Sequence, residues 1–307
     1  MGRRKGAGKA KHRPPGNNIT TELSPDVLLI HILPKLPVKS LRRFSDSLPF
    51  KGDNFSVVAS SHGMVCYHDI RHSDLILWNP VRGDYKTLSK SGSHEECYDY
   101  NGGPFGLYYS SSDDDYKLLR VTLYTDVYIY SLKSDSWRKV ELEEDFRSPL
   151  ISWMPSTALL NEKLYFLQKR VSKENDIHYS IIRFDTKTEQ FTEIATPFSK
   201  NFERYSLSFL VLRGYIHVCE NIAKRGVIMW RMDGDGDWTK VVSLFPWCLE
   251  PLHLMRNDNW LMRSNKGNHL YQVDMKKHTK TKLCSLPRTT TIVEYKETIV
   301  SPNSYTK

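Results

Sequence analysis

The sequence lacks the features that would place the protein in a membrane or outside the cell. No stretch approaches the roughly 18 consecutive apolar residues that a membrane-spanning helix needs, and no apolar segment follows the basic N-terminus. The five cysteines are odd in number, scattered and without CxxC spacing, which favours a reducing compartment over a disulfide framework. We therefore expect a soluble, unsecreted protein of the nucleus, the cytoplasm or both, with no membrane partner.

The part of the chain that should fold has little net charge. The formal charge is +9, but six basic residues lie within the first thirteen positions: Arg3, Arg4, Lys5, Lys9, Lys11 and Arg13. The remainder is close to +3, which argues against a nucleic-acid-binding face on the folded part. Residues 1–18 are rich in Gly, Lys, Arg and Pro and predict a disordered tail, which could be a nuclear import signal, a phosphate-binding arm or simply solvated chain.

Known catalytic motifs are also missing. The sequence contains no GxSxG elbow, phosphate-binding Gly-rich loop, HExxH motif or dinucleotide fingerprint. The residues Asp233, Asp235 and Asp237 have the spacing of a calcium loop, but Trp238 and Leu244 stand where that loop needs Gly and Glu. This acidic cluster therefore predicts a polar β-turn.

No metal site is predicted either. His62, His68 and His72 are spread across a strand and a loop, without a fourth ligand nearby. His217 and Cys219 share one face of a predicted strand, where a buried cysteine is the commoner outcome. The sequence thus predicts a non-catalytic protein without a cofactor.

A helical stretch at Leu23–Phe44 dominates the N-terminal part. Its apolar residues recur at helical spacing, at Leu28, Leu29, Ile32, Leu33 and Leu36. Ser24 suits the N-cap and Pro25 the first helical position, and a second short helix is expected at Val38–Phe44. Because two short helices bury little surface alone, their apolar faces need a partner, which could be another protein or the protein's own domain.

Beyond residue 50 the pattern changes to strands. Five segments share one plan, an apolar strand, a polar turn and a second strand: Leu75–Leu88, Val127–Leu142, Ile181–Ile194, Val227–Val242 and Leu270–Leu283. Further strand pairs are predicted between them, at Ser56–Asp69, Ala158–Gln168, Phe209–Asn221 and Met255–Ser264. The acidic run Asp113–Asp115 predicts a solvated turn before a strand at Tyr116–Val121.

The five segments align as a repeat. Their anchors are Asn79, Ser131, Asp185, Met232 and Asp274, and an aromatic residue follows six positions later in four of them: Tyr85, Trp137, Phe191 and Trp238. The fifth has Lys280 there. The anchors lie 42 to 54 residues apart, as in propeller blades. We expect a mostly β protein, a β-propeller of about six blades over residues 50–302, with a terminal strand at Thr291–Val300 available to complete a blade that begins near Ser56.

Two parts of the sequence resemble known plant families. Pro25, the pair Ile32 and Leu33, and the run LPVKSL at Leu36–Leu41 resemble the first half of a plant F-box. Downstream, the segments LWNPVRGDYKTL, GPFGLYYSSSDDDYKLLRV, VYIYSLKSDSWRKVE and IVEYKETIVSP resemble the plant F-box-associated domain, which is similar to kelch propellers. After Phe44 the chain continues with SDSLPFKGDNF, where an F-box normally has a further helix, so the F-box (residues 19–46) is shortened.

The resemblance implies a receptor subunit of a Skp-cullin-F-box (SCF) ubiquitin ligase. The F-box would bind the Skp-type adaptor, and through it the cullin-RING ligase, while the propeller would bind an unknown target protein. The adaptor contacts implied by the resemblance are Pro25, Ile32, Leu33, Leu36, Pro37, Val38 and Leu41. An alternative is a propeller interaction module whose degenerate F-box no longer recruits the ligase. A third class, a propeller enzyme, would need Tyr, His and Cys ligands converging on a metal.

Recognition of the target is expected in the loops of the propeller rim. Aromatic anchors favour partner binding, and six of them fall outside the strand pattern: Tyr98, Tyr100, Phe105, Phe146, Trp153 and Trp247. These residues are the predicted target contacts.

Overall fold

The structure is a computed structural model that describes the following parts of the chain: residues 55–69, 71–89, 103–122, 126–142, 146, 151–172, 176–197, 205–222, 226–234, 236–244, 249–255, 258–264, 269–285 and 298–304. Within these residues the regular secondary structure is almost entirely β-strand, joined by turns, and none of them lies in an α-helix. The helices predicted at Leu23–Phe44 lie outside the described residues.

The strands form five separate four-stranded sheets. Blade 1 contains β1 (Phe55–Ser61), β2 (Met64–Asp69), β3 (Asp74–Trp78) and β4 (Tyr85–Thr87). Blade 2 contains β5 (Phe105–Ser110), β6 (Asp115–Val121), β7 (Val127–Ser131) and β8 (Ser136–Val140). Blade 3 contains β9 (Ile151–Leu160), β10 (Lys163–Val171), β11 (Ile177–Asp185) and β12 (Phe191–Ala195).

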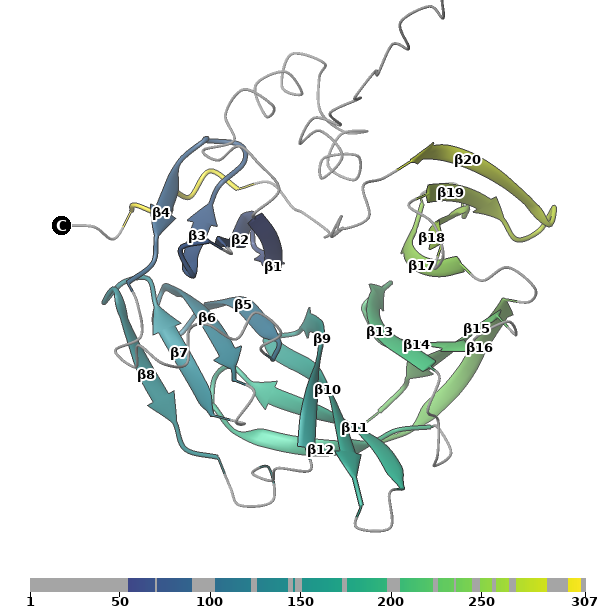
Figure 1. Ribbon diagram of the computed structural model, residues 1–307, viewed down its shortest axis with the longest axis horizontal. Coiled ribbons are helices and arrows are strands. Elements are labelled where there is room, and N and C mark those ends of the chain that lie inside the picture. Colours follow the sequence, from purple (N-terminus) through teal and green to yellow (C-terminus); the bar gives the residue numbers. More distant parts are fainter. Residues whose placement is uncertain are drawn as a thin grey trace, which may run out of the picture.

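The last two blades repeat this order. Blade 4 contains β13 (Tyr205–Leu212), β14 (Tyr215–Ile222), β15 (Gly226–Met232) and β16 (Trp238–Leu244). Blade 5 contains β17 (Leu249–Leu254), β18 (Trp260–Ser264), β19 (His269–Asp274) and β20 (Thr279–Ser285). Each sheet is antiparallel and follows the order of the chain, with its first strand toward the centre of the ring and its fourth at the periphery (Figure 1). This arrangement is a five-bladed β-propeller.

The number of blades differs from the sequence-based expectation. About six blades were expected, whereas the described residues form five. All four strands of blade 1 come from residues 55–87, so that blade is complete without a C-terminal strand. Of the strand expected at Thr291–Val300, residues 298–300 are described and are not in a strand, and the others lie outside the description.

The predicted hairpins are confirmed, and turn chemistry explains their anchor residues. The Asn79 side-chain oxygen accepts hydrogen bonds from the backbone N–H groups of Val81 and Arg82 (2.9 and 3.3 Å). In the same way, Asp185 and Asp274 each accept two N–H groups of the turn that follows them. An Asn or Asp at this position closes the turn because its side chain imitates a backbone carbonyl. The repeat in the sequence is therefore a repeat of turns between the third and fourth strands.

Apolar side chains fill the spaces between adjacent blades. Between blades 2 and 3, Phe166 and Phe184 are fully buried, and the ring of Tyr108 meets that of Phe184 edge to face at 6.1 Å between centroids. Similar clusters join blades 1 and 2, blades 3 and 4, and blades 4 and 5. Because adjacent blades share these apolar clusters, the blades depend on one another to fold.

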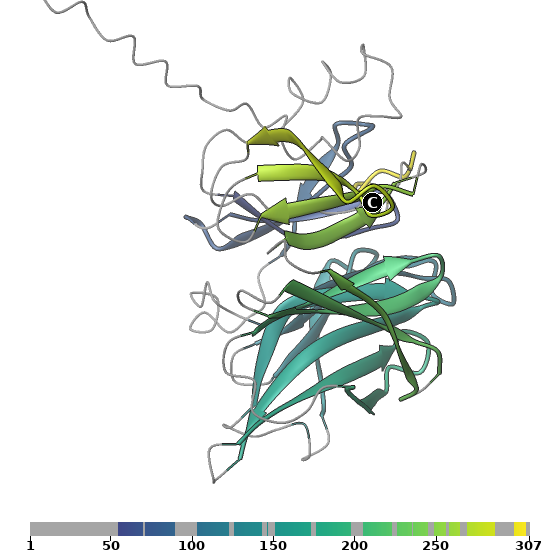
Figure 2. The same cartoon turned by 90° about the vertical axis from the view of Figure 1, so that its right-hand side faces the viewer.

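Alternating strand directions give the ring two different faces, seen edge-on in Figure 2. The turns after the first and third strand of each blade lie on one face, here called the hairpin face. The turns after the second strand and the links to the next blade lie on the other, the connection face. Among the described residues, nine of the ten non-glycine residues with positive φ belong to hairpin-face turns. The hairpin face is thus built from tight, conformationally fixed turns.

Residues 298–304 are held against the outer turn of blade 1. The buried Asn79 amide donates hydrogen bonds to the carbonyl oxygens of Thr298 and Val300 (3.0 and 2.6 Å). Gly63, at φ 77°, faces Thr298 so closely that a Cβ atom would collide with it. The C-terminal segment is therefore fastened to the first blade, as expected from the sequence, although not as a strand.

Candidate partner-binding surfaces

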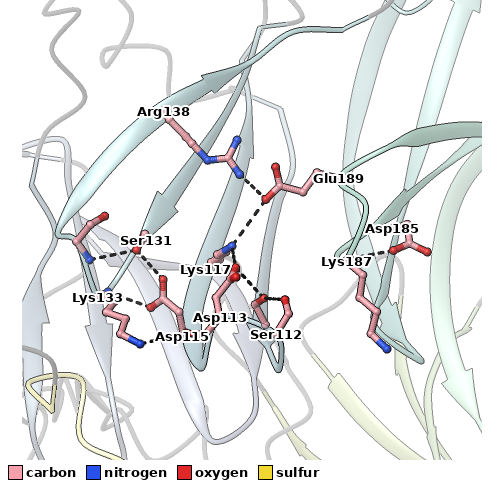
Figure 3. Close-up of polar contacts among 12 residues, drawn as sticks. Ser112, Asp113, Asp115, Lys117, Ser131, Lys133, Arg138, Asp185, Lys187 and Glu189 are labelled. Carbon is pink, nitrogen blue, oxygen red and sulfur yellow. Dashed lines mark hydrogen bonds and ion pairs between the residues drawn. The ribbon is translucent and has the colours of Figure 1, made fainter.

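Charged side chains of the hairpin face link blades 2 and 3 (Figure 3). Asp115, at the start of β6, is only 2% exposed and accepts hydrogen bonds from the Ser131 hydroxyl (2.6 Å) and the Lys133 N–H (2.9 Å). Asp115 therefore connects the two hairpin-face turns of blade 2, which join β5 to β6 and β7 to β8. The expectation of a solvated turn at Asp113–Asp115 is corrected here, because Asp115 is buried while Asp113 and Asp114 are exposed.

Glu189, in the outer turn of blade 3, reaches across to blade 2. Its carboxylate contacts the Arg138 guanidinium closely and lies 3.7 Å from the Lys117 ammonium. Lys117 also contacts Asp113, and this hydrogen bond holds the pKa of the Asp113 carboxyl below its usual range. Charged side chains of blades 2 and 3 are thus paired with one another across the blade boundary, where they join the two blades.

A second contact crosses the same boundary. The Ser111 hydroxyl donates to Glu162 (2.7 Å), which also pairs with the Lys187 ammonium at 2.7 Å. The hydrogen bond from Lys187 lowers the pKa of the Glu162 carboxyl. Because these groups are exposed, the pairs orient the turns more than they stabilise the fold.

The predicted target contacts divide into three groups. Tyr98, Tyr100 and Trp247 lie outside the described residues. Phe105 is half-buried on β5, with the Arg120 guanidinium 5.8 Å above its ring.

Phe146 and Trp153 are 6% and 9% exposed, and both pack in the core between blades 2 and 3. The prediction of target contact is wrong for these two residues, since partners cannot reach them. Trp153 lies within β9, where its ring meets Phe166 edge to face at 6.1 Å, and not in a loop.

The predicted adaptor contacts, Pro25, Ile32, Leu33, Leu36, Pro37, Val38 and Leu41, all lie outside the described residues. The structure therefore neither brings them together nor separates them.

No cluster of three potential metal ligands occurs among the described residues. Cys66, Cys219 and Cys284, the cysteines within them, are all free thiols. Burial raises the pKa of the Cys66 and Cys219 thiols, which keeps both protonated and unreactive. The described residues contain no helix that could span a bilayer.

Sequence patterns missed three exposed apolar residues on blade 1 and the C-terminal segment. Val81, Tyr85 and Ile299 are 43%, 50% and 81% exposed. The Asn303 amide donates to the Tyr85 carbonyl oxygen at 3.3 Å, and Arg82 donates to that of Ile299 at 3.4 Å, so these contacts hold the C-terminal segment beside the outer hairpin of blade 1. No sequence pattern indicated this contact, because residues 82 and 299 are far apart in the chain and meet only in the folded structure.

Comparison with known proteins identifies a family. A family model described as the F-box associated beta propeller domain matches residues 22–219, more than half of the chain. An F-box/kelch-repeat protein of Arabidopsis thaliana is 26% identical over 205 residues, which cover 62% of this chain and 53% of that protein. The F-box protein ETP2 of the same plant is 26% identical over 201 residues, with coverages of 59% and 49%. The chain spans about half the length of the curated relatives it matches.

Solved structures agree on the fold. The structure of YjhT has a TM-score of 0.51 at 11% sequence identity, covering 78% of this chain and 86% of that one. A luciferin-regenerating enzyme has a TM-score of 0.50 at 9% identity, covering 79% of both chains. At such low identity the likeness extends to the fold alone.

Proposed function

Because this chain belongs to the family of F-box associated beta propeller domains, we propose that it is the target-binding subunit of an SCF ubiquitin ligase. The observation that carries the proposal is the order of its parts, an apolar helical face predicted at Pro25–Leu41 directly before the propeller. The relatives are F-box proteins, which supports a receptor role. The protein itself would catalyse no bond chemistry.

Two surfaces divide the work in this proposal. The shortened F-box binds the Skp-type adaptor through the apolar residues Pro25, Ile32, Leu33, Leu36, Pro37, Val38 and Leu41. The propeller binds the target, and Tyr98, Tyr100, Phe105 and Trp247 remain proposed contacts. Tethering a target beside a loaded ubiquitin carrier raises the effective concentration of its lysines, so proximity replaces catalytic residues. Action in the nucleus or the cytoplasm is part of the same proposal.

Co-purification of the full chain with a Skp-type adaptor tests the proposal. Wild type should retain the adaptor, and Ile32→Asp and Leu36→Asp should each reduce retention more than about tenfold, because a charge enters an apolar contact. Val241→Asp on β16 is the matched control, since Val241 is 41% exposed and far in sequence from the F-box. If wild type retains no adaptor, the receptor role in the ligase is rejected.

A second candidate follows from the missing F-box helix after Phe44. In this alternative the propeller binds its target but no longer recruits the ligase. Target capture without adaptor retention, and without accelerated turnover of the target in cells, would favour it.

A further inference from the structure

Blade 5 lacks an inter-blade contact that blades 2 and 4 share. In those two blades the tryptophan that opens the fourth strand donates its indole N–H to a carbonyl at the end of the preceding blade. The indole nitrogen of Trp137 lies 2.7 Å from the carbonyl oxygen of Ser89, and that of Trp238 lies 2.8 Å from the carbonyl oxygen of Ala195. In blade 5 the equivalent residue is Lys280, whose ammonium lies 5.4 Å from the centroid of the Tyr271 ring. Lys280 therefore stands where blades 2 and 4 have a tryptophan that hydrogen-bonds to the preceding blade.

The strand that carries Lys280 is also the most open of the peripheral strands. β20 is seven residues long, and all but Cys284 are exposed. Its partner is β19, and no further strand pairs with it within the described residues. An edge strand directs alternate N–H and C=O groups away from its sheet, so β20 presents a row of backbone groups that another strand could use.

The β19–β20 hairpin accounts for the net charge of the chain beyond its N-terminal tail. Lys276, Lys277, Lys280 and Lys282 against Asp274 alone give residues 269–285 a charge of +3. This equals the charge of residues 14–307 as a whole, so the rest of that stretch is neutral. Within the described part of the chain, no carboxylate forms an ion pair with Lys280 or Lys282, whereas Lys139 on the matching strand of blade 2 pairs with Asp126 at 2.9 Å.

We propose that the edge of β20 binds an acidic, extended segment of the target protein by strand addition. The backbone edge would provide the hydrogen bonds, and the lysines would select the charge of the added strand. The same lysines repel another copy of this strand, which keeps the edge from pairing with itself. The inference rests on the proposed function only in assigning the segment to the target, since binding at the edge needs no adaptor.

Fluorescence anisotropy with the full chain and no adaptor tests this inference. The probe is a fluorescein-labelled peptide of about ten alternating valine and glutamate residues, a length that spans a typical strand. The double variant Lys280→Glu/Lys282→Glu should bind it at least about tenfold more weakly than wild type, and added salt should weaken wild-type binding. The double variant Lys133→Glu/Lys139→Glu makes the same change of charge on the outer hairpin of blade 2 and should bind like wild type. Equal losses in both variants would overturn the proposal.

A second probe separates strand addition from simple ionic attraction. The same peptide carrying N-methyl groups on alternate residues keeps its charge but loses the backbone donors of one edge. We expect it to bind at least about tenfold more weakly. Equal binding of both peptides, or tighter binding of an oligouridylate of similar length, would contradict strand addition. Because the adaptor is absent, neither result bears on the F-box.

Discussion

The outer hairpins of blades 2 and 5 have the same topology but use their positive charges differently. On blade 2, Arg138 contacts Glu189 of the next blade, and Lys139 pairs with Asp126. On blade 5, Lys280 and Lys282 have no carboxylate partner within the described residues, and the edge around them is exposed. Positive charge on blade 2 is therefore neutralised by carboxylates of its own and the next blade, whereas the charge on the edge of blade 5 remains available to a partner.

Removing the core beneath the blade 2–3 boundary should have the largest effect on stability. Phe184→Ala should lower the free energy of unfolding by about 3–5 kcal/mol, because Phe184 is fully buried between two blades. Leu283→Ala on β20 is the control and should change it by less than about 0.5 kcal/mol, since Leu283 is 43% exposed. Denaturant unfolding measures both. Equal losses would mean that blade 5 is as tightly packed at its edge as blade 2 is at its boundary.

The fastening of the C-terminal segment should matter next. Asn79→Ala removes two hydrogen bonds to residues 298 and 300 and the closure of its own turn. We expect a loss of about 2 kcal/mol, because two partly buried carbonyl groups lose their donor. Asp274→Ala, at the same position of blade 5, removes only exposed turn contacts and should lower the free energy of unfolding by less than Asn79→Ala does. A larger loss for Asp274→Ala would show that the fifth blade is the more constrained one.

The ion pairs across the blade 2–3 boundary should contribute less. Glu189→Gln should lower the free energy of unfolding by about 1 kcal/mol at low salt, because the nearly buried Lys117 loses one of its two carboxylate partners. The loss should shrink in high salt. Asp258→Asn is the control, since its pair with Arg213 at 3.0 Å is more than half exposed. Thermal melts of both variants at two salt concentrations measure the two losses. An equal loss with the same salt dependence in both variants would contradict a larger contribution from the Glu189 ion pairs.

A buried carboxyl predicts a small pH effect in blade 4. Glu220 is 4% exposed and accepts a hydrogen bond from the Trp230 indole at 3.3 Å, and burial raises the pKa of its carboxyl. The folded state then holds the proton more tightly than the unfolded state. Stability from this group is present below the unfolded pKa near 4.5 and falls as pH rises toward the folded pKa.

Glu220→Gln keeps the acceptor oxygen and removes the charge. The variant should therefore melt at a higher temperature than wild type at pH 8, and the difference should vanish near pH 4. A variant that is less stable than wild type at pH 8 would contradict the sign of this effect.

The sequence was sufficient to predict features that depend on neighbours along the chain. Alternating apolar residues and turn-closing side chains such as Asn79 and Asp185 identified five outer hairpins. The strand at Tyr116–Val121 was predicted, but its partner β5 was not, because Phe105–Ser110 has apolar residues side by side where alternation is expected. β5 is the inner strand of its blade and is buried on both faces over Gly106–Tyr108.

Features that depend on distant residues were not predictable. Phe146 and Trp153 resemble loop aromatics in the sequence, yet the neighbouring blade covers both. Glu189 meets Lys117 and Arg138 only because adjacent blades stack. The blade count depends on twist and closure of the ring, which no local pattern encodes.

Simultaneous binding of an adaptor and a target peptide tests whether one chain joins the two. The full chain is captured on an immobilised Skp-type adaptor, and the glutamate-valine peptide is then added while surface plasmon resonance is recorded. We predict capture of wild type, loss of capture in Ile32→Asp, and peptide binding by the captured chain with the affinity of the free chain. Absence of capture for wild type, or equal capture of Ile32→Asp, would contradict the account.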